Sequence, residues 1–170
     1  MAMQTERFDR LDGLAAAVDR LGADETRTAR EFAVARAKIA AHGLPAPSRA
    51  APVLRARLRQ VAALARRGQW PRAAADLAAV EEALSVARRR ADGLYEIAAG
   101  LLHRRDELRD RLEAYRRKAA AAGLAGDGGL AEDHERARRL LYTAPCDLRA
   151  SARAVHAYRL ALAARLEARR

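Results

Sequence analysis

The sequence predicts an all-α fold: an elongated antiparallel helical bundle or coiled coil with one long central helix. Alanine, leucine, arginine and glutamate, which have high helix propensity, are abundant, and the five prolines fall at or between the predicted helices. Between residues 77 and 122, apolar side chains recur at alternating steps of three and four, the heptad spacing of a long helix packed along one seam. The seam consists of Leu77, Val80, Leu84, Ala87, Ala91, Leu94, Ala98, Leu101, Leu108, Leu112, Tyr115, Ala119 and Ala122.

Residues 4–42 are predicted to form the first helix, because their apolar side chains also follow a heptad seam. This seam is imperfect, since Gly22, Glu25 and Arg36 occupy seam positions. Two alternatives remain open: one continuous helix, or a break after Gly22 with Asp24 capping a second half-helix. The continuous helix is favoured because the apolar residues beyond this point keep the phase set before it.

The same periodicity predicts four further helices, over residues 52–67, 71–122, 130–142 and 148–168. Segments rich in proline or glycine separate them, and Asp147 is a good N-cap for the last helix. Gly93 and Gly100 weaken the helix over 71–122, where we expect at most a bend. Residues 1–170 are therefore predicted to form a single helical domain with two lobes, about 4–100 and about 101–170, which share the long helix.

The net charge of +11 is concentrated in two short segments. Residues 51–75 contain six arginines and no acidic residue, and residues 148–170 contain six arginines and one glutamate. Such a local excess favours an anionic partner. Only two of the 33 basic residues are lysine, however, which is typical of a GC-rich bacterial genome. Codon bias without a binding role therefore remains an open alternative for part of the arginine content.

The candidate partner-binding residues are the arginines of these two segments that lie on predicted helix faces. They are Arg55, Arg59, Arg66, Arg67, Arg149, Arg153, Arg159 and Arg165. We expect them to bind a protein partner with an acidic surface, and homo-oligomerisation is a further possibility. Nucleic acid or an anionic membrane surface is the alternative partner. Nucleic acid is the weaker prediction because base stacking needs aromatic side chains, and only Trp70 and Tyr158 lie in or beside these segments.

Arg105 is the one charged residue that interrupts the seam of the long helix. A lone polar group at a core position can fix helix register or oligomeric state. Alternatively, the seam opens near the junction of the two lobes and the Arg105 side chain is solvated. The sequence does not favour either interpretation.

No catalytic or metal-binding pattern stands out, and we predict a protein that is not an enzyme and has no cofactor. His103 and Glu107 lie one turn apart, which favours an ordinary contact on a helix surface over a metal site. Cys146 is the only cysteine, so no intramolecular disulfide is possible and a reducing cytoplasm is expected. The sequence contains no run of eighteen apolar residues, so no transmembrane segment is predicted. Residues 1–8 lack the pattern of a signal peptide.

The segment Leu-Leu-Tyr-Thr-Ala-Pro-Cys-Asp-Leu, from Leu140 to Leu148, resembles helical regions of actinobacterial proteins associated with Ser/Thr-kinase signalling. The resemblance implies a signalling or scaffold role in a bacterium and brings no catalytic residue with it. The functional prediction is therefore a non-enzymatic helical module for protein–protein interaction or scaffolding. The alternative is a basic helical protein that binds nucleic acid or an anionic membrane surface.

Overall fold

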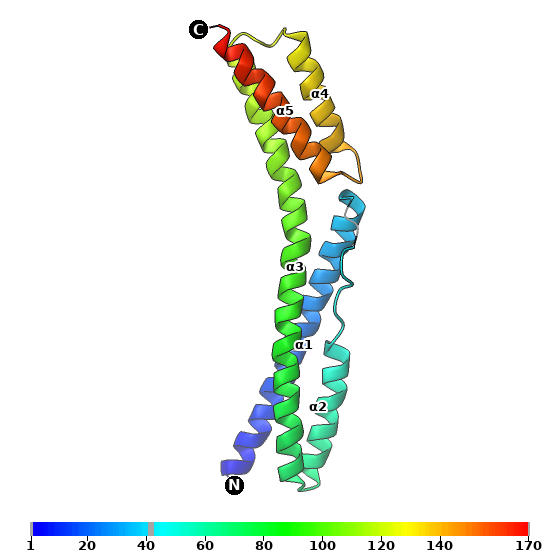
Figure 1. Ribbon diagram of the computed structural model, residues 1–170. Helices are drawn as coiled ribbons and strands as arrows, with labels where there is room; N and C mark the ends of the chain where they lie inside the picture. Colours follow the sequence, from blue (N-terminus) through cyan, green and yellow to red (C-terminus); the bar gives the residue numbers. More distant parts are fainter. Residues whose placement is uncertain (1, 41–42, 170) are drawn as a thin grey trace. The chain divides into compact units, whose positions relative to one another are not determined.

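The computed structural model describes residues 2–40 and 43–169, and these form an all-α protein (Figure 1). The helices are α1 (Ala2–Lys38), α2 (Ala51–Arg66), α3 (Trp70–Ala121), α4 (Gly128–Tyr142) and α5 (Leu148–Glu167). The described residues contain no strand, although Ile39 and Cys146 form an isolated backbone bridge. The predicted fold class is therefore confirmed, with a single helix spanning Trp70–Ala121 as expected.

Helix α1 is continuous through its weak point, which confirms the favoured alternative. Leu21 and Phe32 are both buried, so the apolar face keeps its phase on either side of Gly22. A side chain at Gly22 would meet the Cβ atom of Ala51 at 3.4 Å. The glycine is therefore the position at which the start of α2 approaches α1 closely.

The end of α1 was predicted too late in the sequence. The helix ends at Lys38, whereas the prediction extended it to residue 42; residues 41 and 42 lie outside the described part of the chain. The Lys38 carbonyl accepts a hydrogen bond from the Cys146 backbone N–H at 2.8 Å, and the Ala40 N–H donates to the Cys146 carbonyl at 2.9 Å. If the helix continued, these backbone groups would form hydrogen bonds within it. They pair with Cys146 instead, and the chain leaves the helical path there.

The chain divides into two compact units, and α1 and α3 contribute to both. Unit 1 comprises Met1–Phe32 and Pro45–Ile97, and unit 2 comprises Ala33–Leu44 and Ala98–Arg170. The sequence placed residues 33–44 in the first lobe, but they belong to unit 2. The physical reason is the Ile39–Cys146 bridge, together with the burial of the Ile39 side chain in the core of unit 2.

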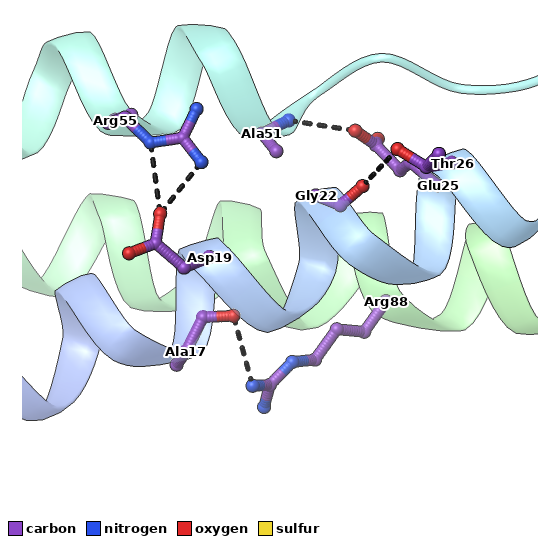
Figure 2. Close-up of polar contacts among 8 residues, drawn as sticks. All are labelled: Ala17, Asp19, Gly22, Glu25, Thr26, Ala51, Arg55 and Arg88. Atoms are coloured by element: carbon purple, nitrogen blue, oxygen red, sulfur yellow. Dashed lines mark hydrogen bonds and ion pairs between the residues drawn. The ribbon is translucent and has the colours of Figure 1, made fainter.

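Unit 1 is built from α1, α2 and the first part of α3, which lie side by side (Figure 1). Arg10 binds Glu81 through two hydrogen bonds of 2.8 and 2.7 Å. Figure 2 shows the second contact, in which the Arg88 guanidinium donates to the Ala17 carbonyl at 3.4 Å. Both contacts join α1 to α3, and both helices advance by seven residues between them, so α1 and α3 run parallel. Helix α2 runs in the opposite direction to both of them. Leucine, valine and alanine form the core, as the sequence indicates.

Unit 2 is built from the end of α3, α4 and α5, with the end of α1 packed against them. The Asp147 carboxylate accepts a hydrogen bond from the Ala150 N–H at 2.9 Å, which confirms the predicted N-cap of α5. Asp127 caps α4 in the same way, by accepting from the Leu130 N–H at 3.0 Å. Helix α4 therefore begins at Gly128, two residues before the predicted start.

None of the helices in the described part of the chain has an apolar stretch that would carry it across a bilayer.

Candidate interaction surfaces

Arg55 and Arg59 of α2 lie on the side of that helix that faces acidic residues of α1. The Arg55 guanidinium donates two hydrogen bonds to one carboxylate oxygen of Asp19, at 3.0 and 2.7 Å (Figure 2). Arg59 lines the same groove between the two helices, and Asp12 lines it from α1. Arg55 therefore balances negative charge within unit 1 instead of facing a partner, whereas Arg59 forms no ion pair there.

The end of the α2 segment leaves positive charge at the surface. Arg66 turns back onto its own helix, where its Nε donates to the Ala62 carbonyl at 3.1 Å. Arg59 and Arg67 are exposed and form no ion pair with any described residue. These two arginines are the members of the α2 patch that are available to an external anion.

The arginines of α5 divide in the same way. Arg165 donates to the second carboxylate oxygen of the α4 cap, Asp127, at 2.9 Å, and the Arg159 guanidinium lies 3.5 Å from a ring nitrogen of His156. Arg149 and Arg153 are exposed, lie one turn apart on the same side of α5, and form no ion pair within the described residues. Arg149 also lies in the first turn of α5, where the helix dipole disfavours a positive charge.

Unit 2 carries most of the net charge. Counted from the sequence, unit 1 has 15 basic and 12 acidic residues, whereas unit 2 has 18 basic and 10 acidic residues. The exposed pair Arg149 and Arg153 therefore lies in the more basic unit. We name these two arginines, with Arg59 and Arg67, the unpaired arginines.

Glu25 is a residue whose role the sequence missed. This residue is only 7 % exposed, and one of its carboxylate oxygens accepts a hydrogen bond from the Ala50 backbone N–H at 2.6 Å. The other oxygen accepts from the Ala51 backbone N–H at 3.1 Å (Figure 2). The residue at the N-cap position of α2, Ala50, has no side chain that could cap the helix. Glu25 supplies this cap from α1. The available signal was a charged residue on the apolar seam together with a helix start that lacks its own cap.

Arg105 is buried, with 6 % of its surface exposed, so the solvated interpretation is wrong. Its Nε donates to the Leu141 carbonyl at 3.0 Å, and Arg109 donates to the same oxygen at 3.0 Å. Leu141 lies in the last turn of α4, and the residue four positions later, Pro145, has no N–H to offer this carbonyl. The two arginines of α3 therefore hold the end of α4 in place. The Arg109 guanidinium also lies 4.2 Å from the centre of the Tyr142 ring.

A pocket with an apolar lining opens in unit 1 among α1, the end of α2 and the start of α3. Its volume is about 270 Å³. The residues that line it are Arg7, Arg10, Leu11, Val61, Trp70, Pro71, Ala73, Ala74 and Leu77. The Phe8 ring packs edge-on against Trp70 with ring centres 5.4 Å apart, and the Arg7 guanidinium lies 5.0 Å from the Trp70 ring centre. The sequence pattern alone does not reveal the role of Trp70, because only the fold brings α1 beside it.

Several titratable side chains of unit 2 make local contacts within the described residues. Burial lowers the pKa of His134, which favours its neutral form, and burial raises the pKa of Tyr158; the two rings meet edge-on at 5.6 Å. Cys146 is buried with its sulfur 3.4 Å from the Ser151 hydroxyl oxygen. His103 contacts Glu107 at 3.4 Å, as expected for side chains one turn apart. Among the residues that the structure describes, no three His, Cys, Asp or Glu side chains are grouped so that they could hold a metal ion.

The two helix caps of unit 2 should make its stability depend on acidity. Hydrogen bonds from backbone N–H groups, above all that of Leu130, lower the pKa of Asp127, and the Ala150 N–H lowers the pKa of Asp147. An unfolded aspartate has a pKa of about 3.9. The stabilisation from a lowered pKa is fully present above that value and is lost as the pH falls through the folded pKa.

We therefore expect the melting temperature to fall between about pH 5 and about pH 2, and to fall less in a variant with both Asp127→Asn and Asp147→Asn. Asparagine still caps a helix but does not titrate in this range. Circular dichroism melts at several pH values measure the difference. Glu81, Glu113 and Glu135, whose pKa values are also lowered by hydrogen bonds from arginines, should leave a residual pH dependence. Equal slopes for the variant and the wild type would contradict the assignment.

The segment that carries the actinobacterial resemblance, Leu140–Leu148, comprises the last three residues of α4, the connection to α5 and the first residue of α5. Leu141 and Cys146 are fully buried, the Ala144–Pro145 peptide bond is cis, and Asp147 caps α5. These roles are structural, and the resemblance remains a prediction. Comparisons of this chain with protein-family models, with curated proteins and with solved structures give no match.

Proposed function

We propose that this chain is a non-enzymatic helical module that binds an acidic surface of a protein partner. The observation that carries the proposal is the division of the predicted basic residues into two classes. Arg55 and Arg165 form ion pairs with aspartates of the chain. The unpaired arginines, in contrast, are exposed and form no ion pair within the part of the chain described here. Charge that folding does not use is available for recognition.

A protein partner is favoured because the exposed basic face of α5 also carries an apolar side chain. Leu160 is 50 % exposed and lies seven residues after Arg153, which places both on the same side of the helix. Protein interfaces combine arginine with apolar contacts in this way. Nucleic acid or an anionic membrane surface is the second candidate, and the excess of basic over acidic residues in unit 2 supports it.

The proposal extends to the cellular setting of the chain. A single buried cysteine fits a reducing cytoplasm, and the arginine-rich composition and the Leu140–Leu148 resemblance fit a bacterial signalling scaffold. We also propose that self-association is possible, and light scattering of the purified chain would measure it.

The test compares two variants with equal loss of charge. One carries Arg→Gln at the unpaired arginines Arg59, Arg67, Arg149 and Arg153. The control carries Arg→Gln at Arg20, Arg30, Arg117 and Arg136, which are also exposed and are likewise divided between the two units. Partners are captured from an actinobacterial lysate by crosslinking, identified by mass spectrometry, and titrated as purified proteins.

Each exposed ion pair contributes only a fraction of a kcal/mol, and the first variant removes four arginines. We therefore expect it to bind the purified partner about tenfold more weakly. The control variant should bind like the wild type. Equal weakening by both variants would mean that only net charge matters. Binding to duplex DNA or to anionic vesicles that weakens steeply with salt, without a protein partner, would support the second candidate instead.

A further inference from the structure

The pocket of unit 1 combines an apolar lining with two guanidinium groups. Helix α1 contributes Leu11, α2 contributes Val61, and α3 contributes Trp70 and Leu77. The volume of about 270 Å³ is larger than the roughly 150 Å³ cavity that accepts a benzene molecule. One aromatic or branched aliphatic side chain would therefore fit.

The two guanidinium groups at this pocket differ in their partners. Arg10 is held by Glu81 through two hydrogen bonds, and the same contact lowers the pKa of the Glu81 carboxyl group. Arg7 has no acidic partner among the described residues, and its guanidinium lies 5.0 Å from the centre of the Trp70 ring. The stacked position restricts the Arg7 side chain while leaving its N–H groups free for a carboxylate.

We propose that this pocket binds an acidic peptide segment of a partner protein, with one hydrophobic side chain inside the pocket and a neighbouring carboxylate on Arg7. The inference rests on the proposed function and adds a specific anchor to it. Buried aromatic and aliphatic anchors in pockets account for much of the affinity of protein interfaces. The hydrophobic side chain of the peptide would contact Trp70, Val61 and Leu77. The peptide carboxylate would bind the Arg7 guanidinium, which has no acidic partner among the described residues.

A nucleic-acid base is a poorer occupant of the same pocket. The lining residues offer guanidinium donors and no carboxylate or amide acceptor. The exocyclic amino groups of a buried base would therefore lack acceptors, which costs free energy. A hydrophobic amino-acid side chain carries no such groups.

Trp70 provides a direct readout, because it is the only tryptophan in the chain and lines the pocket. The probe is the end-blocked pentapeptide Glu-Glu-Phe-Glu-Glu. We expect it to change the Trp70 emission in a saturable way. Peptides with alanine in place of phenylalanine, or with glutamine in place of every glutamate, should bind about tenfold more weakly or not at all. An emission change of equal size and midpoint with oligo-dA would overturn the assignment to a peptide.

Two variants test the geometry, each with a matched control at an exposed position of α3. Arg7→Gln removes the free guanidinium, and Ala74→Leu fills the pocket from an exposed position on α3. Their controls are Arg72→Gln and Ala75→Leu, at exposed positions that do not line the pocket. Circular dichroism melts establish that all four variants are folded.

Both pocket variants should lose peptide binding by about tenfold, and both controls should bind like the wild type. No emission change with the wild type, or an equal effect of variants and controls, would overturn the inference. The outcome is separable from that of the proposed function. If the variant of the unpaired arginines loses its protein partner while Ala74→Leu keeps it, the pocket assignment fails and the proposed function stands.

Discussion

Replacing Glu25 with alanine should lower the free energy of unfolding of unit 1 by about 2–4 kcal/mol. The carboxylate accepts hydrogen bonds from two backbone N–H groups at the start of α2, at 2.6 and 3.1 Å, and Glu25 itself is only 7 % exposed. A hydrogen bond to a charged group contributes about 1.5–3 kcal/mol, and a donor left unpaired in a buried site adds its own penalty. The variant also removes a negative charge from the positive end of the α2 dipole.

Urea unfolding followed by Trp70 emission measures this loss, because Trp70 and α2 belong to the same unit. Glu25→Gln should fall between the wild type and the alanine variant, since its amide oxygen accepts only one of the two bonds. The control is Glu82→Ala, at an exposed position of α3, with an expected change below about 0.5 kcal/mol. An alanine variant of Glu25 as stable as this control would contradict the assigned cap.

The features of the fold that depend on neighbouring residues could be predicted from the sequence. The heptad spacing predicts the extent of α3, and the Asp147 cap acts on a residue three positions away. Glu25, in contrast, caps residues 25 and 26 positions further along the chain. Only the docking of α2 on α1 brings them together. For this reason the same residue looked like an imperfection of the seam.

The same limit applies to the basic surfaces. Composition and helical periodicity locate the arginine-rich segments correctly, but they cannot separate Arg55 from Arg59. Arg55 pairs with Asp19, which is 36 residues away, and Arg165 pairs with Asp127, which is 38 residues away. Whether an arginine is consumed by folding or remains available depends on which acidic residue the tertiary fold places beside it. The pocket at Trp70 depends on the fold in the same way, since three helices line it.

Replacing Arg105 and Arg109 together with methionine should destabilise unit 2 by about 2–4 kcal/mol. The double variant leaves the Leu141 carbonyl without a donor, because Pro145 cannot supply an N–H and Leu141 is fully buried. Such an orphaned acceptor costs about 1–3 kcal/mol, and the contact between the Arg109 guanidinium and the Tyr142 ring is lost as well.

Arg105→Met alone should lower the free energy of unfolding by about 1 kcal/mol or less, because Arg109 still donates to the Leu141 carbonyl. Arg109→Met alone should lower it somewhat more, because the contact with the Tyr142 ring is also lost. Methionine fills the space of the stem, and a buried charge replaced by an apolar group of similar size is often tolerated. Chemical denaturation of the two single variants and the double variant gives the coupling free energy between the arginines. A control with Arg111→Met and Arg117→Met, at exposed positions of the same helix, should change the stability by less than about 0.5 kcal/mol per substitution.

The cycle also decides what Arg105 contributes at its seam position. If the double variant loses much more than the sum of the single variants, the two arginines act as alternative donors to one carbonyl, and Arg105 serves the end of α4. If Arg105→Met alone causes the full loss while Arg109→Met has little effect, Arg105 has a role beyond the shared hydrogen bond, and the register interpretation gains support. A stable Arg105→Met variant with altered light scattering would instead assign it to oligomeric state, because only the association of copies would then have changed.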